Sequence, residues 1–320
     1  MILRGVATKG LSGLADTRLE GLDRVVRATG PPRCRRALSD ALMLAFGALD
    51  PLAGARALGW MGIMAKRDDE HWVMTWPDQL HGLLAPGPTN TLSVSLDLEL
   101  DPPQFGQLRQ HAVHDPDLVN ALGNARLRLT TGWAFTPDLT LASPAILSAR
   151  IGDHHLDREK KRWVVPWLVS LASRLHAHTP RSPNVELWAQ AQRSPDPARR
   201  SAYQRAIQAL KRAPFSIGEV RVVETGGKRW LVVGEELLPL TRLGPLVCNA
   251  VALVESVFLD DADILVVEEP GALTEHPRAL LNWLARQATE PDSPLEQVLL
   301  LSGSGDLQLS PPSLDPALTL

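Results

Sequence analysis

The chain has 320 residues, a formal net charge of -3 and 22% charged residues, so its totals favour neither nucleic acid nor a membrane surface as a partner. With 44% hydrophobic residues it can bury one large core or two. Its two cysteines, Cys34 and Cys248, fit no metal-binding spacing and suit a reducing compartment. The N-terminus resembles no signal peptide, and no apolar run approaches the ~20 residues that cross a bilayer. We therefore expect a cytoplasmic protein with no metal site and no membrane contact.

The N-terminal region predicts a strand, a loop and a helix. Residues 2–4 and 24–27 are expected to be short strands on either side of a segment punctuated by glycines. The loop ATGPPRCRR follows at 28–36, and an apolar stripe then predicts a helix over 37–49, which Asp50 and the next proline end. ATPases place their phosphate-binding loop in this order of elements.

The next part of the chain predicts one well-defined strand. Residues 91–100 alternate between apolar and polar side chains, which is typical of a strand with one buried face. The segments 125–131 and 139–142 are candidates to pair with it. Residues 53–87 have no clear period, so we expect an irregular insertion or edge hairpins there.

Between residues 153 and 212 the pattern becomes helical, which predicts a helical lobe. An apolar helix is expected over 163–175 and a basic amphipathic helix over 200–212. The basic face has two interpretations. It is a solvated surface, or together with the arginine-containing loop 28–36 it forms a contact for nucleic acid through the segment 198–212.

The C-terminal part predicts alternating strands and helices. Two strands, 219–224 and 228–233, should form a hairpin across Thr225-Gly226-Gly227. The elements expected after them are an apolar helix at 246–258, a buried strand at 264–267, a helix at 276–286 and a strand at 297–301. We expect strands 24–27, 264–267 and 297–301 in one sheet, with 24–27 and 264–267 as neighbours.

Two carboxylates stand at the end of the buried strand 264–267. Parallel sheets hold ligands at the carboxyl ends of their strands, and Glu268 and Glu269 are at such an end. A strand, two acids, a loop, a helix and a second strand form the layout of a Walker B segment, in which the first acid holds Mg²⁺ and the second polarises water. The alternative is an ordinary strand–helix–strand unit with acids at its edge.

The order of these elements resembles the ABC-type ATPases of the SMC, RecF and OLD group. Those proteins open with a strand, a "GL.D" segment, a second strand, and then GxxGxGKST running into a helix. Here LSGLADTRLEGLDRVV precedes the loop and ALSDAL begins the helix at 37–42. The resemblance implies an α/β P-loop NTPase fold, the ABC-type ATPase head, as one domain over 1–320 with the 153–212 lobe inserted.

Anchoring the resemblance on the helix places Arg35 at the loop lysine, Arg36 at the Mg²⁺-binding Ser/Thr and Cys34 at the last glycine. It implies that a cofactor-binding loop would use Gly30, Arg33, Arg35 and Arg36. The cradle itself contains Pro31 and Pro32. Proline has no N–H and a restricted φ, whereas a phosphate cradle needs successive N–H groups that converge on the ligand.

The rest of the resembled pattern is present in part. The family's EExxxxHP motif corresponds to EEPGALTEHP, which implies Glu268, Glu269 and His276 as remnants of the catalytic set. The signature motif corresponds only to LTRLGPLV, out of register, and Gly303 stands where the family has a histidine that senses the γ-phosphate.

These departures predict a catalytically impaired ABC-type ATPase subunit, a pseudo-ATPase with a structural or regulatory role, in a complex of DNA repair or phage defence. We expect no cofactor and a dimer, with itself or with an intact ATPase homologue. Two alternatives stay open. One is an active enzyme that binds ATP and Mg²⁺ through Arg35 and Arg36, and the other is a DNA-binding module.

Overall fold

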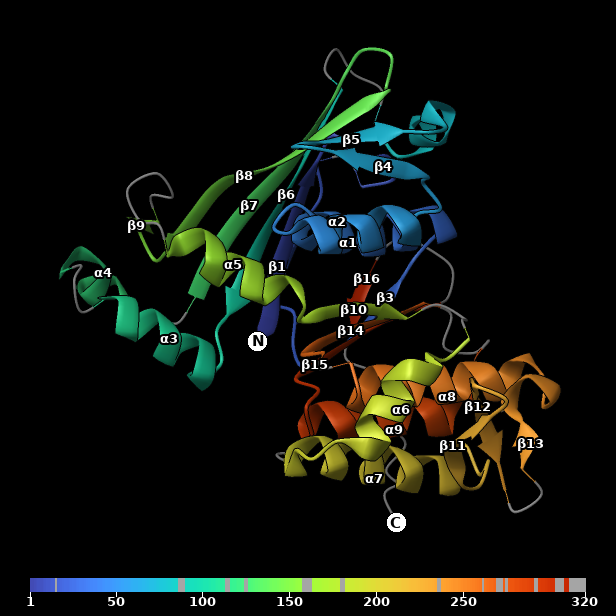
Figure 1. Ribbon diagram of the computed structural model, residues 1–320. Coiled ribbons are helices and arrows are strands. Elements are labelled where there is room, and N and C mark those ends of the chain that lie inside the picture. The colour runs from blue at the N-terminus through green and yellow to red at the C-terminus, as the bar shows by residue number, and fades with distance from the viewer. Residues whose placement is uncertain are drawn as a thin grey trace. The chain divides into compact units, whose positions relative to one another are not determined.

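The computed structural model describes residues 1–14, 16–85, 90–112, 116–123, 126–156, 163–178, 182–234, 237–260, 262–268, 273, 276–290, 293–302 and 308–310. Its chain forms two compact units. The first contains Met1–Asp23, Thr29–Leu175 and Ser304–Leu309, and the second contains Arg24–Ala28, His176–Gly303 and Ser310–Leu320. Both contain helices and strands, so the predicted α/β class is confirmed (Figure 1). Among the described residues, no helix is long and apolar enough to cross a membrane.

An eight-stranded antiparallel sheet forms the centre of the first unit. Seven strands lie in the order β2-β1-β6-β7-β8-β5-β4, and β9 pairs with β8. They are β1 (Ile2–Lys9), β2 (Arg18–Glu20), β4 (Ala65–Asp68), β5 (His71–Met74), β6 (Thr91–Glu99), β7 (Arg126–Phe135), β8 (Leu141–Ile151) and β9 (His154–His155). The strand predicted at 91–100 is confirmed as β6, because its leucines and valine alternate with polar residues and are buried on one face.

Helices cover the apolar face of this sheet. The helices of the unit are α1 (Pro32–Gly47), α2 (Pro51–Trp60), the 3-10 helix η1 (Pro77–Gly82), α3 (Pro102–Ala112), α4 (Pro116–Ala121) and α5 (Val164–Ala172). Helix α1 packs on β6 and β7, and the indole Nε1 of buried Trp133 on β7 donates to the carbonyl of Leu44 at 3.0 Å. This bond joins the sheet to the last turns of α1.

Helix α2 lies where the sequence predicts irregular structure. Its first turn is capped by Asp50, whose carboxylate accepts a hydrogen bond from the N–H of Ala53 at 3.0 Å. The two helices approach closely at Gly47 and Gly54, since a Cβ on Gly47 would lie 2.9 Å from the Cβ of Ala57. The prediction for 53–87 is confirmed in part, because β4 and β5 form a hairpin at the edge of the sheet. Helix α2 was missed, because a capping residue and a glycine contact produce no apolar period.

The second unit contains β14, β15 and most of β3, which are the parallel strands of a five-stranded sheet in the order β10-β14-β15-β3-β16. The strands of this sheet are β3 (Val25–Thr29), β10 (Leu175–His178), β14 (Ile264–Glu268), β15 (Gln297–Leu301) and β16 (Gln308–Ser310). Strands β14, β15 and β3 are parallel neighbours in that order. The predicted common sheet is confirmed. The predicted contact between 24–27 and 264–267 is wrong, because the β14–α9–β15 connection places β15 between them.

The second unit also contains further helices and a small separate sheet. They are α6 (Val185–Arg193), α7 (Pro197–Lys211), β11 (Val220–Thr225), β12 (Lys228–Val233), β13 (Leu238–Pro239), the 3-10 helix η2 (Leu240–Arg242), α8 (Pro245–Phe258) and α9 (Pro277–Thr289). Strands β11, β12 and β13 form a separate antiparallel sheet. The predicted hairpin is confirmed, and Gly226 and Gly227 both have the positive φ that its tight turn requires.

The helices predicted between 153 and 212 exist but are divided between the units. Helix α5 belongs to the first unit, whereas α6 and α7 belong to the second. Strand β8 pairs with β7 and not with β6, so the second of the two predicted partners of 91–100 is wrong. The assignment of residues 1–320 to one ATPase-like domain concerns both units together and stays a prediction.

Candidate functional site

The connection between β3 and α1 is the position of the predicted phosphate loop. Strand β3 ends at Thr29 and α1 begins at Pro32, so only Gly30 and Pro31 lie between them. The helix begins five residues before the predicted start at residue 37. Proline is favoured at the first position of a helix, because its missing N–H would have no helical partner there and its fixed φ suits the turn. The prediction of a loop over 28–36 is therefore wrong.

The backbone at this connection does not fit a phosphate cradle. Pro31 and Pro32 have no N–H, and the N–H groups of Cys34 and Arg35 both donate to the carbonyl of Pro31, at 2.9 and 3.1 Å. A cradle needs several N–H groups that converge on the same phosphate. Two of the donors are absent here and two are bound within the helix. The residues therefore do not fit a bound ATP with Mg²⁺.

Arg35, at the position of the loop lysine, is a buried residue of the helix. Its side chain is 6% exposed, and its Nε donates to the carbonyl of Gly30 at 2.9 Å. This bond ties the first turn of α1 back to Gly30, the residue that directly follows β3. The Arg35 side chain thus fixes the backbone at Gly30, where a phosphate-binding loop would need free N–H groups.

The neighbouring arginines also have partners within the first unit. The Arg36 Nε lies 3.2 Å from the Asp40 carboxylate, its Nη2 donates to the carbonyl of Trp60 at 2.7 Å, and its guanidinium lies 5.0 Å from the centre of the Trp60 ring. Arg33 donates to the hydroxyl of Ser12. Arg33, Arg35 and Arg36 therefore bind three different parts of the unit, and the predicted ligands do not converge on one point.

The two arginines of β3 and its flank are likewise bonded within the second unit. Arg24 forms an ion pair with Glu296 at 3.2 Å, and the Nε of Arg27 donates to the hydroxyl of Ser302 at 3.2 Å. These contacts account for both side chains without a nucleic-acid partner.

The Walker B position retains the geometry that the sequence predicts for its first acid. Glu268 ends β14, and in the register of the parallel sheet it is opposite Leu301, which is opposite Ala28. The carboxyl ends of β14, β15 and β3 thus lie along one edge of the sheet, and Glu268 is half-buried at that edge. Glu269 lies outside the described residues.

His276 is an exposed residue at the start of helix α9. It is the N-cap residue of α9, and no side-chain bond caps the helix there. Its side chain lines a hollow of about 210 Å³ with mainly apolar residues, among them Phe215, Leu246 and Leu273.

The segment at the signature position forms the start of helix α8. Gly244 is the N-cap residue and has a φ of 91°, which explains why glycine stands there, and Pro245 is the first helical residue. Burial raises the pKa of the Cys248 thiol above its ordinary value, so the thiol stays protonated at neutral pH. Gly303, at the position of the γ-phosphate sensor, lies outside the described residues.

Comparisons with known proteins gave structural similarity alone. No family model matches the sequence, and no curated protein matches it. The chain is similar to an SMC head solved with the C-terminal winged-helix domain of ScpA, at 11% identity and a TM-score of 0.49 over 94% of this chain and 90% of that one. Further similar structures are the SMC head domain of Thermotoga maritima (11% identity, TM-score 0.43, 98% and 100% coverage) and the recombination mediator RecF with ATP (7%, 0.40, 97% and 95%).

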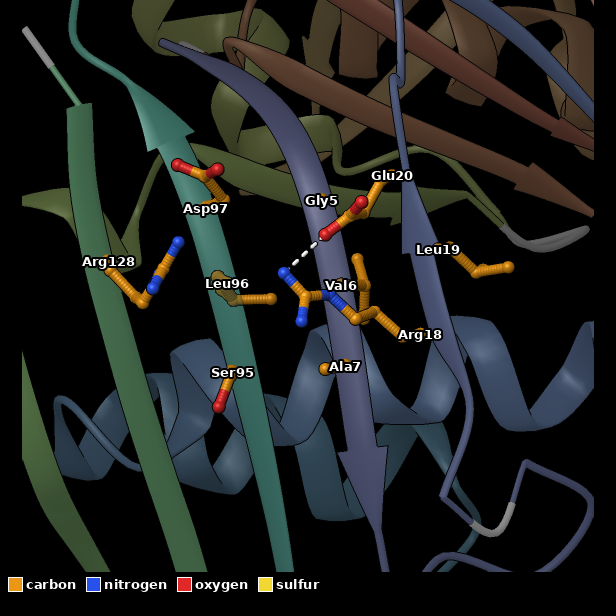
Figure 2. A pocket seen from close by; sticks show the side chains of 10 residues that line it. All are labelled: Gly5, Val6, Ala7, Arg18, Leu19, Glu20, Ser95, Leu96, Asp97 and Arg128. Carbon is orange, nitrogen blue, oxygen red and sulfur yellow. Dashed lines mark ion pairs between the residues drawn. The ribbon is translucent and has the colours of Figure 1, made fainter.

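Sequence reasoning missed a polar hollow on the open face of the first sheet (Figure 2). Its volume is about 240 Å³, and small residues of β1, Gly5 and Ala7, form its floor. Arg18 and Glu20 of β2, which form an ion pair, lie on one side, and Arg128 of β7 lies on the other. The floor residues and the side residues are cross-strand neighbours in the sheet. The pattern of apolar and polar residues within one strand does not show which residues of another strand lie beside it. The mixed charges favour neither an anion nor a cation.

Among the described residues there is also no group of three or more histidine, cysteine or acidic side chains that could hold a metal ion.

Proposed function

We propose that this chain is an ATPase-like head that does not bind nucleotide at the β3–α1 connection and serves as a structural or regulatory subunit. One observation carries the proposal: only Gly30 and Pro31 join β3 to α1, Pro31 and Pro32 supply no N–H, and the buried Arg35 of α1 bonds to the Gly30 carbonyl. Phosphoryl transfer depends on positioned phosphates and charge stabilisation more than on covalent chemistry of the protein. Glu268 at the sheet edge therefore has no positioned phosphate on which to act.

An arginine at the lysine position does not compensate for the missing cradle. Arg35 would have to give up its bond to the Gly30 carbonyl and leave a buried environment before it could contact a phosphate. Its planar guanidinium also differs from the compact ammonium of lysine. Loss of the cradle donors, the lysine and the hydroxyl together should remove several kcal/mol of binding and transition-state stabilisation, roughly 3 kcal/mol for each donor of this kind.

We expect titration calorimetry to show no saturable Mg-ATP binding that depends on Arg35 or Glu268 at nucleotide concentrations up to about 1 mM, which corresponds to less than about 4 kcal/mol of binding free energy at this connection. The reason is the absence of converging N–H donors at Pro31 and Pro32. Arg35→Lys should gain no binding, because it restores the charge but not the donors. Micromolar binding that is lost in both Arg35→Ala and the near-isosteric Glu268→Gln would contradict the proposal and favour an active ATPase.

A structural role also predicts how assembly responds to nucleotide. If the chain forms a dimer with itself or with an intact ATPase, its own connection should contribute nothing that depends on ATP. The molar mass from size-exclusion chromatography with light scattering, measured for the chain alone, should be the same with and without Mg-ATP. A nucleotide-dependent change that Glu268→Gln abolishes would argue for a working nucleotide site.

A further inference from the structure

A groove in the second unit is lined by residues of helices α7 and α9 and by the end of α8. Its volume is about 570 Å³, within the range of sites that hold small molecules. The α7 residues that line it recur every three or four positions, as do those of α9, so each helix contributes one face. None of these residues belongs to the candidate nucleotide positions described above.

The groove carries an excess of positive charge. The groove is lined by three arginines and one acid. These are Arg205 of α7, Arg212 directly after α7, Arg286 of α9, and Glu290. Among the residues that the structure describes, no carboxylate forms an ion pair with Arg212 or Arg286, and both side chains are exposed. Cationic walls around a concave surface concentrate the field and attract anions.

Two other exposed cations of the same unit are neutralised by close partners. Lys211, next to Arg212 in the chain, forms an ion pair with Glu219 at 2.9 Å, and Arg193 pairs with Glu224 at 3.2 Å. Arg212 and Arg286 also lie near the C-terminal ends of their helices, where a positive charge is favoured by the helix dipole. The dipole accounts for their position along each helix. It does not account for both arginines lining one groove without a carboxylate partner.

The floor and the remaining walls suit an anion that also accepts hydrogen bonds. Gln204 and Gln208 of α7 line the groove and can donate through their amide groups. Trp283 and Phe258 are buried beneath it, and the Arg205 guanidinium lies 5.8 Å from the centre of the Phe258 ring. Apolar rings below the charges reduce the local dielectric response, which strengthens ion pairing with a ligand. Because both rings are covered, they offer no exposed face on which bases of a nucleic acid could stack.

We propose that this groove binds a small ligand that carries more than one phosphate group. Arg205 and Arg212 are seven residues apart, which spaces them by about 10 Å along α7, and Arg286 contributes from the other helix. Charges distributed in this way suit a chain of linked phosphates better than a single phosphate ion. Inorganic oligophosphate and nucleoside polyphosphates share this chemistry. The site is separate from the β3–α1 connection, so the inference goes beyond the proposed function.

The test uses the full chain and inorganic triphosphate, titrated by calorimetry without Mg²⁺ at low ionic strength. We expect saturable binding that weakens as salt is added. Arg212→Gln and Arg286→Gln should each weaken it about tenfold, as expected for loss of one charge-assisted contact. Glu290→Gln should strengthen it, because a repelling charge is removed. The matched control is Arg200→Gln, an exposed arginine of α7 outside the groove, which should bind like the unmodified chain.

Several results would overturn the inference. The first is the absence of saturable triphosphate binding. The second is equal binding by both groove variants and the unmodified chain, with circular dichroism showing that all three are folded. The third is tight binding of a single-stranded oligonucleotide without binding of triphosphate. A comparison of ATP with triphosphate separates the two sources of the ligand. ATP binding that depends on Arg286 and not on Glu268 would support the groove and leave the proposed function intact. ATP binding with the opposite dependence would overturn the proposed function alone.

Discussion

Replacing Glu255 by alanine is expected to lower the free energy of unfolding of the second unit by about 3 kcal/mol or more. Glu255 lies on α8, is 0% exposed, and holds the start of helix α6. Its Oε2 accepts hydrogen bonds from the N–H of Asn184 at 2.7 Å and from the indole Nε1 of Trp188 at 2.8 Å. Alanine would leave the buried indole N–H of Trp188 and the partly buried N–H of Asn184 without this acceptor, and an unsatisfied buried donor costs about 1 to 3 kcal/mol.

The control for this prediction is Glu255→Gln, which keeps the size of the side chain and one carbonyl oxygen. An amide oxygen oriented toward Asn184 and Trp188 can still accept both bonds, so we expect a loss of only about 1 kcal/mol. Urea unfolding followed by circular dichroism and tryptophan fluorescence measures both variants. A double-mutant cycle with Trp188→Phe should show coupling between the two side chains. Equal stability of Glu255→Ala and the unmodified chain would show that the buried carboxylate does not hold α6.

Replacing Arg35 by alanine is expected to lower the free energy of unfolding by about 2 kcal/mol. The rate of ATP hydrolysis measured for the purified protein should not change. The side chain is buried, so solvent does not weaken its bond to the Gly30 carbonyl as it would for an exposed pair. Alanine removes that bond and leaves an internal space where the long side chain lay. The start of α1 should become less stable than the rest of the helix.

The matched variant is Arg35→Met, which retains a long side chain but has no donor. We expect it to be less stable than the unmodified chain and more stable than Arg35→Ala, because only the hydrogen bond is lost. Thermal melts rank the three proteins, and hydrogen exchange of the amides after Pro32 locates the change. A loss of ATP hydrolysis in Arg35→Ala with unchanged melting would identify Arg35 as a phosphate ligand and contradict our assignment.

Several elements could be predicted from the sequence because local patterns determine them. The turn at Gly226 and Gly227 needs positive φ at both residues, which glycine adopts without strain. The helix at 246–258 is predominantly apolar and the strand at 264–267 is a continuous apolar segment, and both have the lengths that buried helices and strands require. The place of Glu268 at the end of its strand follows from the same local pattern.

The start of α1 could not be predicted from the family resemblance. Aligning the chain with a phosphate-loop motif treats Arg33, Arg35 and Arg36 as loop residues, whereas Pro32 begins a helix that includes all three. Helix α2 was missed for a related reason: an aspartate cap and a close contact between Gly47 and Gly54 leave no apolar period in the sequence.

Only the tertiary structure decided which partners the charged side chains have. A sequence shows that arginines are close together in the chain, but a long flexible side chain can reach groups on several elements. The fold directs Arg35 to Gly30 and Arg36 to Trp60, and it brings Arg212 and Arg286, far apart in the chain, to the same groove. Apolar periodicity determines the elements because burial is a property of each segment. The chemistry of the sites depends on contacts between segments, which exist only after the elements have packed.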